Sequence, residues 1–125
     1  MQENRIVIII DKPVEEVFEF TTNPKNTHLW VPFIEEEIAD EFPPKIGTVY
    51  KNRRGDSWNT SIVMEYETSR LFKLENDVFA VTYSYKKIKD NSTELVYLES
   101  VKQGQLTKPL TKEVLQKLKS VLESN

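Results

Sequence analysis

From about residue 34 to residue 100, short runs of β-branched and aromatic residues alternate with short turn signals. Runs of this kind, bounded by Gly, Pro, Asn and Asp, are typical of β-strands. Together with a first strand at 5–10, they predict strands near 34–40, 47–53, 57–67, 70–75, 79–88 and 93–101. Strands joined by turns this short pair antiparallel. The chain is therefore expected to form an antiparallel sheet of about seven strands.

Helical spacing appears first between the first two predicted strands. Pro13 begins a helix in which Val14, Val17 and Phe18 share one face. Pro24 ends this helix and begins a second short helix, because a proline disfavours helical backbone in the residue before it. Two short helices are therefore expected between strands 1 and 2.

A longer amphipathic helix is predicted at the C-terminal end, in the segment PLTKEVLQKLKSVLE (109–123). Pro109 suits a first turn. The apolar residues that recur at helical spacing are Leu110, Val114, Leu118, Val121 and Leu122. A helix of about 15 residues is about 22 Å long, close to the reach of a seven-residue strand. This helix is expected to lie along the sheet and cover its concave face.

Composition excludes several classes of function. The chain has 125 residues, no Cys and one His, His28, so residues 1–125 are expected to form a single domain without metal or cofactor. The net charge is −3 and no basic stripe stands out, which argues against nucleic-acid binding. The apolar run before Asp11 has only five residues, too few for a signal peptide or for membrane insertion. We expect a cytoplasmic protein.

The order of these elements resembles the START/Bet v 1-like (SRPBCC) superfamily, and most closely its small bacterial polyketide cyclase/dehydrase-like branch. Four segments that together span most of the chain carry the resemblance: IIIDKPVEEVFEFTTNPKNTHLWVP (8–32), PPKIGTVYKN (43–52), WNTSIVMEYETSRLF (58–72) and LTKEVLQKLKSVLE (110–123). The resemblance implies an α+β helix-grip fold, in which a curved sheet wraps the C-terminal helix around an internal pocket. It does not settle function, because one fold hosts many functions.

Alternation along the predicted strands indicates which side chains face that pocket. The predicted ligand-binding residues are Trp30, Trp58, Thr60, Met64, Tyr66, Phe79, Tyr83, Tyr85, Tyr97 and Glu99. Aromatic bodies with polar tips suit a small hydrophobic or aromatic ligand, although the same residues would also serve as ordinary core packing. The run Glu35–Glu37 is interpreted as a solvated strand face.

Three functions are compatible with this pattern. The first is binding of a small hydrophobic or aromatic ligand. The second is a cyclase or dehydratase-type reaction with Glu99 or His28 as acid or base, for which no convergent partner group is identifiable. Each residue also has a simpler explanation, since Glu99 can lie at the pocket mouth in water and His28 can be an ordinary surface residue. The third is a protein-interaction module resembling the co-chaperone relatives.

A homodimer interface is predicted on the outer face of the sheet. Val7 and Ile9 are expected to point outward from the first strand, and Val96 and Leu98 from the last. The resemblance places these two strands side by side, so the four side chains would form one apolar patch. Such patches often mark interfaces, although a monomer tolerates a small one.

Overall fold

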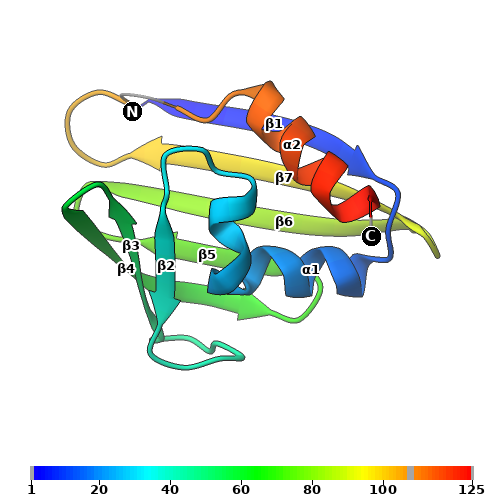
Figure 1. Cartoon of the computed structure of the whole chain (residues 1–125), viewed down its shortest axis with the longest axis horizontal. Coiled ribbons are helices and arrows are strands. Elements are labelled where there is room, and N and C mark those ends of the chain that lie inside the picture. Colours follow the sequence, from blue (N-terminus) through cyan, green and yellow to red (C-terminus); the bar gives the residue numbers. More distant parts are fainter. Residues whose placement is uncertain (1, 107–108, 125) are drawn as a thin grey trace.

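The computed structural model describes residues 2–106 and 109–124 (Figure 1). The elements along the chain are β1 (Glu3–Ile10), α1 (Val14–Thr22), the 3₁₀ helix η1 (Pro24–Leu29), β2 (Glu36–Ala39), β3 (Val49–Arg54), β4 (Ser57–Glu67), β5 (Leu71–Glu75), β6 (Phe79–Lys89), β7 (Ser92–Val101) and α2 (Lys112–Glu123). This order matches the predicted one, including both short helices between the first two strands.

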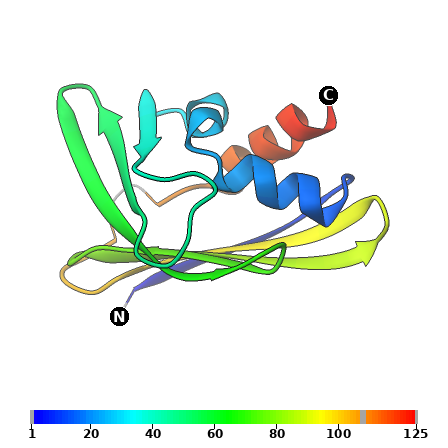
Figure 2. The ribbon, with the colours of Figure 1, turned by 90° about the horizontal axis from the view of Figure 1, so that it is seen from below.

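The seven strands form one antiparallel sheet in the order β1-β7-β6-β5-β4-β3-β2. The sheet is strongly curved, and Figure 2 shows the β3–β4 hairpin rising steeply on the side that carries the helices. At the tip of this hairpin, Gly55 has a φ of +62°, a left-handed conformation that glycine adopts without steric cost. The predicted α+β helix-grip fold is confirmed.

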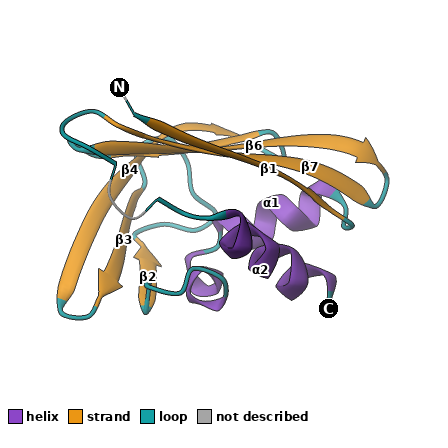
Figure 3. Ribbon diagram, turned by 90° about the horizontal axis from the view of Figure 1, so that it is seen from above, coloured by secondary structure: helices purple, strands orange, loops and turns teal. Residues whose placement is uncertain are grey.

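All three helices lie on the concave side of the sheet (Figure 3). Helix α2 packs mainly against β1, whereas α1 contacts β6 and β7. The largest fully buried side chains are Ile10, Val17, Val63, Phe72, Thr93, Leu95, Leu115 and Leu118. The helices therefore share one core with the curved sheet. No helix within 2–106 and 109–124 is long and apolar enough to cross a membrane.

Helix α2 begins later than the sequence pattern suggested. Thr111 is its N-cap, and the Thr111 hydroxyl accepts a hydrogen bond from the Val114 N–H. Pro109 therefore precedes the helix instead of forming its first turn, and Leu110 is buried in the preceding segment. Leu115, which the predicted apolar stripe omitted, is fully buried. The twelve residues of α2 give it a length of about 18 Å.

The predicted orientation of β4 is wrong over most of its length. Trp58 is 47% exposed and Met64 46% exposed, and Thr60 is also exposed on the outer face. The cause is a β-bulge between Val63 and Glu65, which changes the parity of the strand. Alternation counted back from Tyr66, which does pack inward, therefore assigned the residues before the bulge to the wrong face.

Candidate functional site

A cavity of about 240 Å³ lies between the inner face of the sheet and the side of the molecule formed by α1 and η1. The predicted place of the pocket against the C-terminal helix is wrong, because no described residue of α2 lines the cavity. Taking about 30 Å³ for each water molecule, it has room for about eight waters, or for a ligand of one or two fused rings. Residues of β2 to β7 line it, together with Thr21, Thr27, Val31, Phe33, Ile34, Val78, Gln105, Leu106 and Leu110. Small-molecule sites are typically such concave spaces with a few polar groups among apolar ones.

One side of the cavity is apolar. Strands β5 and β6 contribute four side chains that we call the apolar wall: Phe72, Leu74, Phe79 and Val81. Leu74 pairs with Val81 across the two strands, so the wall is continuous. Tyr83 follows on β6 and packs at 5.8 Å, centroid to centroid, from the ring of Phe72. This side of the cavity can bury the flat face of an apolar molecule.

The opposite side is polar. Strands β2, β3 and β4 contribute four side chains that we call the polar wall: Glu37, Asn52, Asn59 and Ser61. Glu37 pairs with Asn52 across β2 and β3, and Asn52 pairs with Asn59 across β3 and β4. Side chains directly opposite one another on neighbouring strands lie on the same face. The three residues therefore form one row across the inner surface.

Glu37 is the ionisable member of the polar wall. Its Oε1 accepts a hydrogen bond of 2.5 Å from the Thr27 hydroxyl, and its Oε2 accepts one of 3.5 Å from the Asn52 amide nitrogen. Burial raises the pKa of the Glu37 carboxyl, and these two hydrogen bonds offset only part of that effect. Among the described residues, the buried Asn52 Oδ1 has no hydrogen-bond partner. This wall thus has unused capacity to accept hydrogen bonds.

Glu99 does face inward, as predicted, but its carboxylate is already occupied. Its Oε1 accepts hydrogen bonds from the Asn4 side chain and from the Leu110 N–H, both at 2.8 Å. Its Oε2 accepts the Tyr97 hydroxyl, also at 2.8 Å. Glu99 thereby joins β1, β7 and the segment that leads into α2. These contacts identify it first as a structural anchor.

Two tyrosines extend the lining between these carboxylates. Burial raises the pKa of Tyr83 well above its usual value, and the neighbouring Tyr85, Glu37 and Glu99 raise it further. Burial likewise raises the pKa of Tyr97, with Tyr83 and Glu99 adding to the effect. Both phenols therefore stay neutral at physiological pH. No hydrogen bond of the Tyr83 hydroxyl is found within the described part of the chain, so this group can serve a ligand.

The predicted ligand-binding residues fall into three groups. Phe79, Tyr83, Tyr97 and Glu99 line the cavity. Trp30, Tyr66 and Tyr85 do not line it but pack behind it: Trp30 contacts Tyr83, and Tyr66 and Tyr85 contact Phe18. Trp58, Thr60 and Met64 lie on the outer face.

Tyr85 illustrates why inward-facing aromatics need not be ligand contacts. Its hydroxyl lies 2.5 Å from the Thr21 hydroxyl, so its polar tip is satisfied within the core. His28 is exposed and does not line the cavity, which leaves it without contact to any bound molecule there.

Sequence reasoning missed the polar wall. Glu37 belongs to the glutamate run that was interpreted as a solvated face, whereas Glu37 is partly buried between exposed Glu36 and Ile38. The inward direction of Asn52 could have been predicted from β3, because Tyr50 is buried and Asn52 lies two positions further along the same face. The pairing of β3 with β4 then places Asn59 beside Asn52 on that face.

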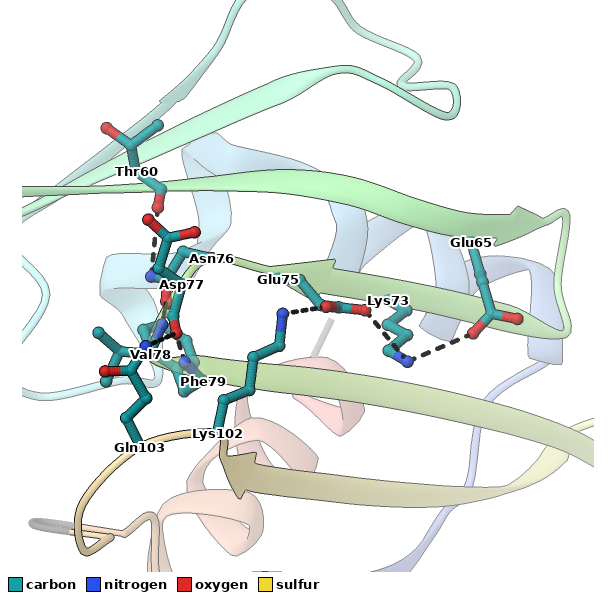
Figure 4. Close-up of polar contacts among 10 residues, drawn as sticks. All are labelled: Thr60, Glu65, Lys73, Glu75, Asn76, Asp77, Val78, Phe79, Lys102 and Gln103. Carbon is teal, nitrogen blue, oxygen red and sulfur yellow. Dashed lines mark hydrogen bonds and ion pairs between the residues drawn. The ribbon is translucent and has the colours of Figure 1, made fainter.

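Solvent reaches the cavity beside exposed lining residues, which include Arg54, Val78 and Gln105. Val78 lies in the turn between β5 and β6, which Figure 4 shows held in place by Asn76. The Asn76 Oδ1 accepts the N–H groups of Val78 and Phe79, and its Nδ2 donates to the Thr60 carbonyl. The turn that carries two lining residues is thus fixed to β4.

An ion-pair chain supports the outside of the same region. Glu75 contacts Lys102 and Lys73, and Lys73 also contacts Glu65 at 3.8 Å (Figure 4). Hydrogen bonding from Lys102 is the largest cause that lowers the pKa of the Glu75 carboxyl. The chain ties β4 and β5 to the end of β7, next to the exposed part of the cavity lining.

On the outer face, the predicted apolar patch has the expected geometry. Val7 pairs directly with Val96, and Leu98 lies two residues further along β7. Ile9 is 40% exposed, and the other three side chains are partly buried. Leu98 pairs with Arg5 and Ile9 with Glu94, so charged residues border the patch.

Solved structures with the same arrangement include a START superfamily protein from Mycobacterium smegmatis, with a TM-score of 0.73, 16% identity and coverage of 98% of this chain and 97% of that one. The Aha1 protein from Colwellia psychrerythraea, solved as a dimer, has a TM-score of 0.74 at 14% identity, covering 98% and 97%. This chain has the START-like helix-grip fold. A conserved Enterococcus faecalis protein of unknown function shares the START-like fold as well, with a TM-score of 0.77, 19% identity and coverage of 96% and 70%.

No protein-family model matches the sequence, and no curated protein matches it either. Identities of 14–19% to the solved structures establish the START-like fold, and the function has to be argued from the cavity itself.

Proposed function

We propose that this chain binds a small apolar or aromatic molecule in the cavity between the curved sheet and the helices α1 and η1. The observation that carries the proposal is the pairing of an apolar wall with a polar wall across about 240 Å³ of space. Such a site buries the body of a ligand and orients it through a few polar groups.

The occupied state of Glu99 favours binding over the enzymatic alternative. Its three hydrogen bonds hold the carboxylate against Asn4, Tyr97 and Leu110, and a general base needs access to the proton it takes. His28, the other candidate acid or base, lies away from the lining. The neutral phenols of the cavity suit orientation of a ligand by hydrogen bonding.

The experiment compares two phenylalanine substitutions at adjacent positions of β6. Val81→Phe places a ring in the cavity, whereas Thr82→Phe places the same ring on the outer face. The probe is 2-naphthol, whose two fused rings suit the cavity volume. We expect Val81→Phe to weaken its binding by at least about tenfold, and Thr82→Phe to leave it nearly unchanged. Equal affinity in both variants, or no binding to the unmodified protein, would overturn the proposal.

The outer patch supports a second, independent proposal, that two copies of the chain form a homodimer through Val7, Ile9, Val96 and Leu98. The supporting observation is that Val7 and Val96 are direct cross-strand partners and that both are partly exposed. Sedimentation at high concentration should show a dimer that the double substitution Val96→Lys plus Leu98→Lys dissociates. A monomer at every concentration would refute the idea.

A further inference from the structure

The unevenness of hydrogen bonding around the cavity indicates which kind of ligand it accepts. An ionised carboxylate offers about four acceptor positions. Glu99 uses three of them in contacts of 2.8 Å. Glu37 uses two, one of which is a 3.5 Å contact at the limit of hydrogen bonding. The open acceptor capacity is therefore concentrated at Glu37.

The Thr27 hydroxyl and the Asn52 amide nitrogen both donate to Glu37, so Glu37 acts only as an acceptor in these contacts. Beside it, the buried Asn52 Oδ1 has no partner among the residues that the structure describes. The protein offers this acceptor no donor, so the donor of a ligand can pair with it in place of cavity water. Two acceptors in need of a donor thus lie next to each other on the polar wall.

The charges around the cavity also indicate the kind of ligand, because they disfavour an anion. Two carboxylates, Glu37 and Glu99, line it, and the one cationic side chain in its lining is Arg54, as far as the described residues extend. Arg54 is exposed, and its guanidinium carbon lies 4.4 Å from the centroid of the Phe33 ring. The positive charge therefore lies at the solvent side, where water screens it, while the negative charges lie within. An anionic ligand would meet like charges in a medium that screens them poorly.

We propose that the cavity selects an uncharged molecule of one or two rings that carries a hydrogen-bond donor, with the donor directed at Glu37 and Asn52 and the ring plane against the apolar wall. This inference rests on the proposed function and adds the class of ligand. It assigns a binding role to Glu37, and it disfavours carboxylates and other anions of the same size.

The test uses three naphthalene compounds of similar size, which differ in one substituent. 2-Naphthol carries a hydroxyl donor, 2-methoxynaphthalene is neutral without a donor, and 2-naphthoate is an anion. Dissociation constants from NMR titration at pH 8 should show 2-naphthol bound at least about tenfold more tightly than 2-methoxynaphthalene, because an unpaired polar site rejects an analogue without the donor. 2-Naphthoate should bind most weakly of the three.

A matched pair of substitutions locates the effect. Glu37→Gln removes the charge of the polar wall with little change in shape, and Glu36→Gln removes a neighbouring charge that pairs with Arg53 on the outer side. We expect Glu37→Gln to weaken 2-naphthol several-fold and to strengthen 2-naphthoate, while Glu36→Gln leaves both unchanged. Loss of folding would weaken both compounds together, so opposite shifts identify a direct electrostatic role.

The outcomes separate the two proposals. If none of the three compounds binds, the proposed function fails, and the ligand class fails with it. If all three bind with similar affinity, the cavity is a binding site but the donor selection is wrong. If 2-naphthoate binds most tightly and Arg54→Gln removes that binding, an anion is preferred and the inference is overturned.

Discussion

The two carboxyl groups that line the cavity differ in how the fold holds them. Glu99 lies on β7 and is bonded to three donors from three different parts of the chain. Glu37 lies on the short strand β2 at the opposite end of the sheet and has one short and one long hydrogen bond. The same residue type therefore serves as an anchor at one end and as an under-occupied acceptor at the other.

The difference teaches how to separate structural from functional polar groups in such a cavity. A carboxylate whose acceptor positions are filled by the protein stabilises the fold and has little left for a ligand, whereas one with free acceptor positions beside a cavity can take a hydrogen bond from a ligand. Trp30 is an exception to the simple rule, since its indole Nε1 is buried without a described partner and yet does not line the cavity. Unsatisfied groups matter for binding only where there is space beside them.

The largest expected effect is on stability at the anchor. Glu99→Ala removes the acceptor for Asn4, Tyr97 and the Leu110 N–H, and should lower the free energy of unfolding by about 3 kcal/mol. Glu37→Ala should cost about 1 kcal/mol or less, because water in the cavity can reach the groups it leaves. Urea unfolding measures both. Equal losses in the free energy of unfolding would show that Glu37 stabilises the fold as much as Glu99 does.

A smaller effect is expected from the two tyrosines. Tyr97→Phe removes a hydrogen bond to the Glu99 carboxylate and should cost about 1.5 kcal/mol in the free energy of unfolding. Tyr83→Phe removes a hydroxyl that has no hydrogen bond within the described residues, and should change stability by less than about 0.5 kcal/mol. Thermal or urea unfolding of the two variants side by side provides the check. A larger loss in the free energy of unfolding for Tyr83→Phe than for Tyr97→Phe would contradict the view that the Tyr97 hydroxyl is structural and the Tyr83 hydroxyl is free for a ligand.

The same contrast explains what the sequence could reveal. Phe79, Val81 and Tyr83 alternate without interruption along β6, so their inward direction was predictable. The face that each side chain of β4 occupies was not predictable, because the local sequence pattern does not indicate the bulge between Val63 and Glu65. Glu99 was found by alternation with Tyr97, but its three partners come from β1, β7 and the segment before α2, and only folding brings them together.

Glu37 was hidden for a different reason. Strand β2 has four residues, which is too short for alternation to establish a face. Three consecutive glutamates at 35–37 look alike in the sequence, while in the fold Glu35 and Glu36 contact Arg53 and Glu37 points the other way, toward Thr27. Its burial depends on η1, which is distant from β3 and β4 along the chain.

The smallest expected effect is the pH dependence that Glu37 contributes to stability. Burial raises the pKa of Glu37 in the folded state above that of an exposed carboxyl. Between those two values the native state binds more protons than the unfolded state, so the free energy of unfolding falls as pH rises through this range. Glu37→Gln lacks this titration. The stability of the variant minus that of the unmodified protein should therefore increase from pH 4 toward pH 7, with Glu36→Gln as the matched control. A difference that stays constant over this range would mean that the carboxyl of Glu37 is solvated, and that the polar wall is open to bulk water instead of reserved for a ligand.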